Sequence, residues 1–513
     1  MLRRPPEILI TTPESLNLLL NSRGGQSLLG GLETVILDEI HAVAGTKRGT
    51  HLISAVERLV PLSGEFQRVA LSATVRPLAA VAEFVGGCRL KGTPAAPAYT
   101  QRPVETIRVA QRKTYRVSVH YPSDEEGQPL RDSVWEPLAD TFLARARRNR
   151  STLIFTNGRN LSEKMAYLVN TAAGELVAYA HHGSLARELR EQVEARLKRG
   201  ELKAVFATSS LELGIDIGAL DEVALLQSPP TISSAVQRSG RAGHRVGAAS
   251  RTRIYCTHPG DLVAAAVMAR AIVNQDIEPL VPVRAPLDVL AQVLVGMVAL
   301  EGVACDELFH RIRCAAPYHR LSRRQFDLVL EMLTGRYAHT RVRELKARAA
   351  VEEESGLVRA RKGALQALYF SGGTIPDRGY FTLRHARGGN RIGELDEEFV
   401  WEAKVGQTFT LGTQNWQIRK ITASDVFVRP APGNRMAPPF WKADGRGRDA
   451  HYAARVAEFL EWIDARLEAP ELEATLETDY GLDAPAADRL VKWLRQQRRH
   501  TRCALPHRHH LVA

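Results

Sequence analysis

Two adjacent carboxylates and a histidine follow a short apolar run near the start of this chain. Val35-Ile36-Leu37 leads directly into Asp38 and Glu39, and His41 comes two residues later. Such a run predicts a strand buried on both faces of a parallel sheet, and ligands bind at the carboxyl ends of such strands. We therefore expect Asp38, with Glu39 beside it, to hold a hard cation such as Mg²⁺ that bridges to nucleotide phosphates. Glu39 would also polarise the attacking water, and His41 would sense the γ-phosphate side. An ordinary strand end with solvated acids is the alternative.

The elements expected around these residues alternate between strands and helices. In the first region we expect a strand at 8–10, a helix at 16–20 and a strand at 69–71. Further along, strands are expected at 151–155, 204–208 and 223–226, and helices at 161–169 and 185–199. This alternation predicts an α/β fold built from βαβ units around parallel sheets.

The bulk composition is that of a globular protein with several domains. The chain has 513 residues, of which 44% are hydrophobic, and this length favours three or four domains. The net charge of +12 permits a polyanionic partner such as nucleic acid. The five cysteines are scattered without a C-x-x-C pair, which argues against a zinc site or disulfide framework and for a reducing cytoplasm. The sequence has no signal peptide and no apolar run long enough to span a membrane, so no membrane partner is expected.

Six short blocks, in this order, resemble the motor motifs of superfamily 2 helicases. They are 11–16 (Thr-Thr-Pro-Glu-Ser-Leu), 38–41 (Asp-Glu-Ile-His), 72–74 (Ser-Ala-Thr), 154–157 (Ile-Phe-Thr-Asn), 208–216 (Thr-Ser-Ser-Leu-Glu-Leu-Gly-Ile-Asp) and 237–244 (Gln-Arg-Ser-Gly-Arg-Ala-Gly-His). One such block is weakly diagnostic, whereas six in register are specific. The resemblance implies two RecA-like motor units that bind ATP with Mg²⁺.

The resemblance also implies roles for single residues in these blocks. Arg238 and Arg241 are three residues apart, so on a helix they share a face and can both point across a cleft. Arg241 would then be an arginine finger, worth roughly 10³ to 10⁵ in rate, with Gln237 and Arg238 beside it. A basic solvated helix is the alternative. The residues expected to bind the nucleotide or couple its state to the cleft are Ser72, Thr74, Gly214 and Asp216.

Three hydroxyl residues are expected to contact nucleic acid. Thr12 precedes a predicted helix, and in the resembled family this turn touches the backbone of the bound strand; a simple capped helix is equally favoured. Thr208 is the last residue of the strand expected at 204–208, and Ser184 lies at the end of another predicted strand, in the His182-Gly183-Ser184 turn. Both offer hydroxyl and backbone N–H groups to phosphates. Phosphate contacts of this kind position a strand without reading its sequence.

Four further blocks resemble the large helicase-related (Lhr) family. They are residues 371–379, 391–398, 406–412 and 439–442. Members of this family are ATP-dependent 3′-to-5′ single-stranded DNA translocases and helicases linked to DNA repair, and they prefer RNA:DNA hybrids. The resemblance extends from Arg4 to about Trp493. It implies single-stranded DNA, duplex DNA or an RNA:DNA hybrid as the partner.

The part from 371 to 441 predicts a small β-rich, barrel-like domain. Trp441 lies among basic residues and is the expected base-stacking residue, because stacking on an aromatic ring is worth roughly 1 to 3 kcal/mol per base. Ile392 would wedge between bases. A position in the protein core is the alternative for both side chains.

The expected architecture is therefore two RecA-like units, the first incomplete, followed by an α-helical winged-helix module and a β-rich domain. The expected parts are 1–95 (partial first motor domain), 96–130 (connector), 131–285 (second motor domain), 286–364 (winged-helix module), 365–495 (Lhr-type β-rich domain) and 496–513 (atypical basic tail).

The motif G-x-x-x-x-G-K-[ST] does not occur in the 513 residues. Its lysine normally holds the β- and γ-phosphates, and superfamily 2 motors carry it upstream of the Thr-Pro-Glu turn. We therefore expect the chain to begin partway through its first motor domain, and the basic tail to be either a truncated or frame-shifted end or a genuine extension. The alternative functions are a non-catalytic nucleic-acid-binding remnant and an RNA helicase of the Ski2 type.

Overall fold

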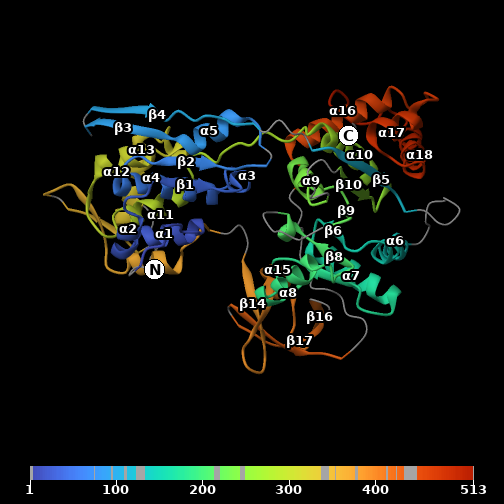
Figure 1. Ribbon diagram of the computed structural model, residues 1–513, viewed down its shortest axis with the longest axis horizontal. Helices are drawn as coiled ribbons and strands as arrows, with labels where there is room; N and C mark the ends of the chain where they lie inside the picture. The colour runs from blue at the N-terminus through green and yellow to red at the C-terminus, as the bar shows by residue number, and fades with distance from the viewer. Residues whose placement is uncertain are drawn as a thin grey trace. The chain divides into compact units, whose positions relative to one another are not determined.

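The computed structural model divides into two compact units, each built from two separate stretches of chain (Figure 1). The first unit is Met1–Val109 with Pro279–Pro376, and the second is Ala110–Glu278 with Asp377–Ala513. The residues described are 4–73, 75–93, 96–108, 113–122, 133–212, 220–242, 249–336, 346–352, 354–375, 379–411, 414–422, 424–432 and 447–511.

The motor part of the first unit is a short parallel sheet with helices packed against it. Strands β1 (Thr34–Leu37) and β2 (Gln67–Ala70) run parallel, with Leu37 opposite Ala70. The helices are α1 (Pro13–Leu20), α2 (Arg23–Leu29), α3 (Ile40–Val43), α4 (Lys47–Ser63) and α5 (Leu78–Gly86). Thr12 caps α1 through its side-chain oxygen, and proline opens the first turn, as helix starts favour.

Two expectations for this region are wrong. Residues 8–10 form no strand, and Ile10 is 94% exposed. β1 is not buried on both faces, because Ile36 is 63% exposed while Leu37 is buried. The reason is the same in both cases. In the part of the chain that the structure describes, the sheet of β1 has only β2 as a second strand, so residues 8–10 have no strand to pair with and one face of β1 is uncovered.

The stretch predicted as a connector holds the second strand of a hairpin and a strand of the second unit. β3 (Cys88–Thr93) and β4 (Ala96–Gln101) form an antiparallel hairpin. The backbone N–H of Cys88 donates to the carbonyl of Cys314 (2.8 Å), and the Tyr99 hydroxyl bonds to Nδ1 of His310 (2.7 Å). These bonds join the hairpin to the helices of residues 305–318.

The second stretch of the first unit contains the region 286–364 predicted as a winged-helix module. Its helices are α11 (Leu287–Met297), α12 (Cys305–Ile312), α13 (Arg323–Thr334) and α14 (Ala364–Phe370). Its small sheet has the order β11 (Val303–Ala304), β13 (Leu357–Ala360), β12 (Ala349–Val351). Ser322 closes a capping box with Gln325 at the start of α13. Phe326 and Leu330 share one core with Ile53 of α4 and Phe84 of α5, so module and motor part are packed together.

The second unit contains a six-stranded, entirely parallel sheet. Its order is β5 (Tyr115–His120), β10 (Ser250–Tyr255), β9 (Glu222–Leu226), β6 (Thr152–Thr156), β8 (Ala204–Ala207), β7 (Ala178–His181). Leu153 and Phe155 of β6 face a core shared with α9 (Ile232–Ser239) and α10 (Pro259–Asn274). Ile154 faces the opposite core, with α6 (Trp135–Arg148) and α7 (Arg159–Ala173). Helix α8 (Arg187–Lys198) follows β7. The RecA-like second motor is thus confirmed.

The predicted β-rich domain is a curled five-stranded sheet. Its order is β15 (Arg391–Asp396), β14 (Tyr380–His385), β18 (Asp425–Pro430), β17 (Gln414–Ile421), β16 (Thr408–Leu411), and α15 (Glu397–Glu402) follows β15. Leu383, Leu395, Phe409 and Trp416 form its core, which alternate inward-facing positions produce. The half-barrel shape agrees with the expected barrel-like fold (Figure 1, orange).

The chain after this sheet folds back onto the second motor. Helices α16 (Ala450–Asp464), α17 (Leu472–Tyr480) and α18 (Ala484–Thr501) join the core of α10, and Trp462 stacks on Phe459 with centroids 5.8 Å apart. α18 runs into the stretch predicted as a basic tail. Leu505 beyond it is buried, and its N–H donates to Asp464 Oδ1 (3.1 Å).

Two general expectations concern cysteines and membranes. All five cysteines are free thiols. Among the helices described, none combines the length and apolar character needed to cross a bilayer.

Candidate nucleotide and nucleic-acid sites

The acidic block and the Ser-Ala-Thr block meet at the carboxyl ends of two paired strands. The register of β1 with β2 carries through the strand ends, since Leu71 N–H donates to Leu37 O (2.9 Å) and Ile40 N–H to Leu71 O (3.1 Å). His41 Nδ1 then lies 3.2 Å from Ser72 Oγ and 3.4 Å from Glu39 Oε2. Sequence-distant motifs are thereby joined into one site.

The backbone at Glu39 holds this arrangement in an uncommon conformation. Its φ is +49°, in the left-handed region that non-glycine residues seldom adopt and that concentrates at functional sites. Glu39 N–H donates to Asp38 Oδ1 (2.9 Å). The turn therefore places Asp38 as an exposed carboxylate, and Glu39 as a half-buried one beside the imidazole.

The carboxylates of this turn fit a hard divalent cation. Asp38 and Glu39 supply oxygen ligands, which Mg²⁺ prefers, and Mg²⁺ usually takes one or two carboxylates together with phosphates and water. Within the described residues there is no group of three or more His, Cys, Asp or Glu side chains that could hold a metal alone. Two carboxylates therefore suit a cation that arrives with a nucleotide.

The arginines of the second motor converge on Glu212. Arg238 lies on α9 and is buried, and its Nε donates to Glu212 Oε2 (2.9 Å). Helix α9 ends at Ser239, so Arg241 lies beyond the helix on which it was expected. Its Nη2 donates to the Glu212 carbonyl (2.6 Å). Gln237, on α9, is half-buried. The pair is therefore not a solvated helix face.

The three hydroxyl residues expected to contact nucleic acid differ in exposure. Thr12 is exposed and caps α1, so the cap exists and the hydroxyl still faces solvent. Thr208 is half-buried, and its N–H donates to His181 O (3.2 Å). Ser184 is 1% exposed, and its hydroxyl accepts a hydrogen bond from Arg159 Nη1. Ile392 packs partly buried against the β-rich core.

Four of the predicted site residues lie outside the described residues. They are Thr74, Gly214, Asp216 and Trp441.

Sequence reasoning missed the partners that orient these groups. Glu212 receives both arginines, and Arg159 holds Ser184 while its Nη2 donates to the Tyr380 hydroxyl (3.0 Å). A buried arginine requires an acidic or carbonyl partner, so the acid inside the 208–216 block was the available signal for Glu212. No sequence signal connects Arg159 with residue 380.

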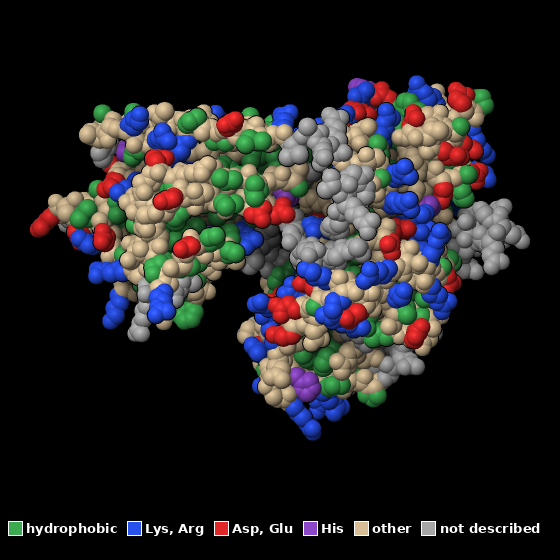
Figure 2. All heavy atoms as spheres, in the orientation of Figure 1, with side chains coloured by type: hydrophobic (Ala, Val, Ile, Leu, Met, Phe, Trp, Pro, Cys, Tyr) green, Lys and Arg blue, Asp and Glu red, His purple; other side chains and the backbone are tan. Residues whose placement is uncertain are grey.

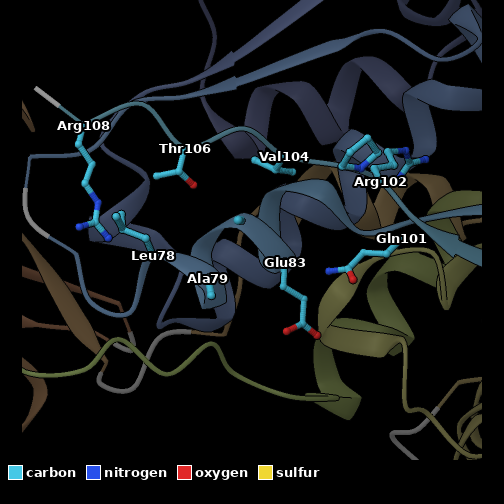
Figure 3. A pocket seen from close by; sticks show the side chains of 10 residues that line it. Leu78, Ala79, Glu83, Gln101, Arg102, Val104, Thr106 and Arg108 are labelled. Carbon is cyan, nitrogen blue, oxygen red and sulfur yellow. The ribbon is translucent and has the colours of Figure 1, made fainter.

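A hollow of about 740 Å³ lies elsewhere on the first unit. Residues of α5, of the end of β4 and of the segment after it line the hollow, among them Leu78, Glu83, Gln101 and Arg108 (Figure 3). None of the predicted site residues lines this hollow, so it is separate from the acidic turn.

Three family models match successive parts of the chain. DEAD/DEAH box helicase matches residues 1–81, helicase conserved C-terminal domain matches 134–246, and large helicase-related protein, winged helix domain, matches 270–438.

Curated relatives and a solved structure extend the similarity over nearly the whole chain. The Lhr helicase/uracil glycosylase of Escherichia coli is 40% identical over 89% of this chain and 32% of its own length. The ATP-dependent helicase Lhr-Core protein 2 of Thermococcus barophilus is 35% identical over 98% of this chain and 58% of its own. The Mycobacterium smegmatis helicase Lhr bound to ssDNA and AMP-PNP has a TM-score of 0.76 and 36% identity, over 97% of this chain and 59% of that one. The chain thus spans between about a third and three fifths of these relatives.

Proposed function

The chain belongs to the large helicase-related (Lhr) family, and on that premise we propose that it serves an ATP-dependent motor that moves on single-stranded DNA and unwinds duplexes. The observation that carries the proposal is the meeting of Asp38, Glu39, His41 and Ser72 at the ends of two parallel strands. Such a site connects the acidic residues that would bind the nucleotide, at the end of β1, to the Ser-Ala-Thr block at the end of β2.

In this proposal the acidic turn prepares ATP for attack by water. Asp38 and Glu39 would hold Mg²⁺, which supplies charge neutralisation at the β- and γ-phosphates. Glu39 accepts a proton from, and orients, the attacking water. His41 contacts both Glu39 and Ser72, so a change at the phosphate side alters the end of β2 as well.

Arg241 is proposed as the arginine finger of the second motor. Its guanidinium is bonded to the carbonyl of Glu212, so to act it must exchange that carbonyl for a phosphate oxygen. Arg238 keeps its bond to the Glu212 carboxylate and thereby holds the turn in place. We assign Arg238 and Gln237 to positioning, and Thr74, Gly214 and Asp216 to coupling.

Single-stranded DNA is the proposed partner, held by its phosphates. Lys and Arg side chains are spread over the face of each unit that Figure 2 shows, in keeping with the net charge of +12. Thr12 and Thr208 offer exposed or half-exposed hydroxyls, Trp441 is proposed as a stacking residue and Ile392 as a wedge. Movement in the 3′-to-5′ direction, use of RNA:DNA hybrids, a DNA-repair role and a cytoplasmic location complete the proposal.

A second candidate function is nucleic-acid binding without turnover. The specific observation in its favour is that no G-x-x-x-x-G-K-[ST] loop occurs in the 513 residues. The Ski2-type alternative is dropped, because the winged-helix match and the relatives are those of the Lhr family.

The binding part of the proposal is tested by fluorescence anisotropy with labelled single-stranded DNA. We expect affinity to fall steeply between about 50 and 200 mM salt, because neutralised phosphates release counterions. Binding that is unchanged over this range, or absent at low salt, contradicts a phosphate-led mode. Directionality is tested in a motor that turns over ATP, with 3′-tailed and 5′-tailed duplexes and hybrids; faster unwinding of 5′-tailed substrates contradicts it.

A further inference from the structure

The sheet of the β-rich domain is extended at its β15 edge by residues 184–186 of the second motor. Within the described part of its sheet, β15 pairs only with β14 on one side. On its other edge Ala186 N–H donates to Ile392 O (2.9 Å), and Glu394 N–H donates to Ser184 O (2.7 Å). Leu185 lies opposite Gly393 in an antiparallel bridge. Residues 184–186 thus add to an open sheet edge, which is the usual way an exposed edge recruits an extended segment.

Side-chain contacts also connect the two partners of this pairing, residues 184–186 and β15, which we call the junction. Leu185 is buried in the β-rich core. Arg159, the first residue of α7, donates to the Ser184 hydroxyl and to the Tyr380 hydroxyl, and its guanidinium lies 5.1 Å from the centroid of the Tyr380 ring, within cation–π range. The junction therefore combines backbone pairing, apolar burial and a shared cation.

Gly393 is required by the closeness of the two backbones. A Cβ atom on Gly393 would lie 2.1 Å from the carbonyl oxygen of Ser184, which no real Cβ contact tolerates. The obstacle is a backbone atom, so it cannot turn aside as a flexible side chain would. Glycine at this position is thus what allows the pairing with residues 184–186.

His181, three residues before this segment, contacts the strand-end turn at Thr208. The carbonyl of His181 accepts hydrogen bonds from Thr208 N–H (3.2 Å) and from the Ser210 hydroxyl (2.9 Å). His181 Nδ1 lies 2.8 Å from Ser210 Oγ. The turn at residues 182–184 is therefore held between β15 on one side and the Thr208–Ser210 turn on the other.

We propose that Gly393 is a positioning residue, because it allows β15 to pair with the motor segment and so to fix the turn at 182–184. The strand-end turns of the second motor and the β-rich domain are then held in place relative to each other, and both bind the same nucleic-acid strand. The inference rests on the proposed binding of single-stranded DNA. Ser184 acts here through its position, because its hydroxyl is buried and bonded to Arg159. Two surfaces that are already ordered relative to each other lose less freedom when a strand binds to both.

Two substitutions open the junction from opposite sides. Gly393→Ala introduces the clash from β15. Ala186→Pro acts from the motor, where φ is −55°, close to the value proline imposes, so the main loss is the N–H that donates to Ile392. We expect each to lower affinity for a labelled oligothymidylate about tenfold, with the melting temperature retained. The amide of Glu394 should lose protection in hydrogen exchange.

The double variant separates a shared junction from two unrelated defects. If both changes disrupt the same pairing, the double variant should bind DNA as well as the single variant with the lower affinity. If they act independently, their losses of binding free energy should add. Gly447→Ala is the matched control, since a Cβ there meets nothing within 4 Å, and we expect parental affinity.

The outcomes distinguish this inference from the function on which it rests. If the parent chain fails to bind single-stranded DNA at low salt, the proposed function fails. If the parent binds, and the variants bind equally well although the Glu394 amide exchanges freely, the inference alone is overturned. Additive losses in the double variant also overturn it. Should Gly393→Ala unfold the β-rich domain, Ala186→Pro and the milder Tyr380→Phe decide the question by the same readouts.

Discussion

Strands β1 and β6 carry similar apolar sequences but have different surroundings. Every residue of β6 is buried, because β8 and β9 pair with it on both sides and helices cover both faces of the sheet. In β1, Ile36 is largely exposed, and β2 is the only strand paired with it among the residues described. The apolar run alone therefore does not decide burial; the neighbouring strands and helices do.

The comparison also separates two kinds of site. The turn of Asp38 and Glu39 forms beside a two-stranded sheet, because its hydrogen bonds are local or come from β2. The arginine site at Glu212 lies on a complete sheet. The geometry of the proposed nucleotide site is thus present in a region whose burial is incomplete, and the predictions below test how the two regions differ.

The largest expected effect concerns ATP turnover. This chain should release no measurable phosphate from ATP with or without single-stranded DNA, because nothing in its 513 residues supplies the lysine-bearing loop that holds the phosphates. Correct positioning of reactants is worth roughly 7 to 11 kcal/mol. Fusing a G-x-x-x-x-G-K-[ST] segment from a relative to the N-terminus should produce turnover, which Glu39→Gln or Arg241→Ala then removes. Robust turnover by the unmodified chain that is lost in Glu39→Gln would falsify this account of the nucleotide site.

A buried carboxylate in each unit provides the next contrast. Glu57 accepts from Arg68 (2.6 Å) and Arg102 (2.9 Å), and all three side chains are nearly inaccessible. Glu57→Ala should cost about 3 to 5 kcal/mol, because it leaves buried arginines without their partner. Glu222→Ala should cost less, about 1 to 3 kcal/mol, because Arg145 and Arg253 are partly exposed. Urea unfolding of both variants measures the difference; equal losses contradict the contrast.

Both units should lose stability in acid, because each contains a buried histidine that resists protonation. Burial, and then the nearby Arg58, lower the pKa of His51 to about 4, opposed weakly by Glu14. Below pH 6.5, His51 is protonated in the unfolded state but stays neutral in the folded state until about pH 4. The free energy of unfolding is therefore at its full value above pH 6.5 and falls as the pH drops towards 4. This difference in pKa between the unfolded and folded states corresponds to about 3 kcal/mol. Burial lowers the pKa of His181 in the second unit to about 4 as well, although Glu194 lies 3.1 Å from its ring, so that unit should lose stability over the same pH range. His51→Gln should flatten the pH dependence of first-unit unfolding; an unchanged profile refutes the assignment.

The smallest expected effect comes from one substitution made in both strands. Ile154→Val in β6 should cost about 0.5 to 1.5 kcal/mol, as removal of a buried methylene does. Ile36→Val in β1 should stay within about 0.5 kcal/mol of the parent, because the side chain already contacts solvent. Denaturant midpoints of the two variants provide the comparison. Equal costs would mean that Ile36 is covered in solution.

Hydrophobic periodicity and motif order in the sequence predicted those helices and strands whose formation depends mainly on neighbouring residues. The strands around Ile154 and Leu225, the helix after Arg159 and the winged-helix module followed from periodicity and motif order. The exposure of Ile36 and Ile10 did not, because it depends on which strands pair with β1. The burial of Ser184 was not foreseeable, since its cover comes from β15, some two hundred residues later in the chain. Arg241 lies beyond α9 because the helix ends at Ser239, and the packing of Leu505 depends on α16.

The interleaved chain path has a consequence for synthesis on the ribosome. The core of the first unit draws on residues up to Leu368, so its N-terminal part must wait for about 260 further residues after Arg108. At translation rates of roughly 5 to 20 residues per second, that wait is about ten seconds to a minute. During this time the faces of α4 and α5 that pack against the winged-helix module have no partner, whereas the second motor's sheet can form as soon as β10 has emerged. The nascent first segment is therefore the part of this protein that most needs protection by chaperones.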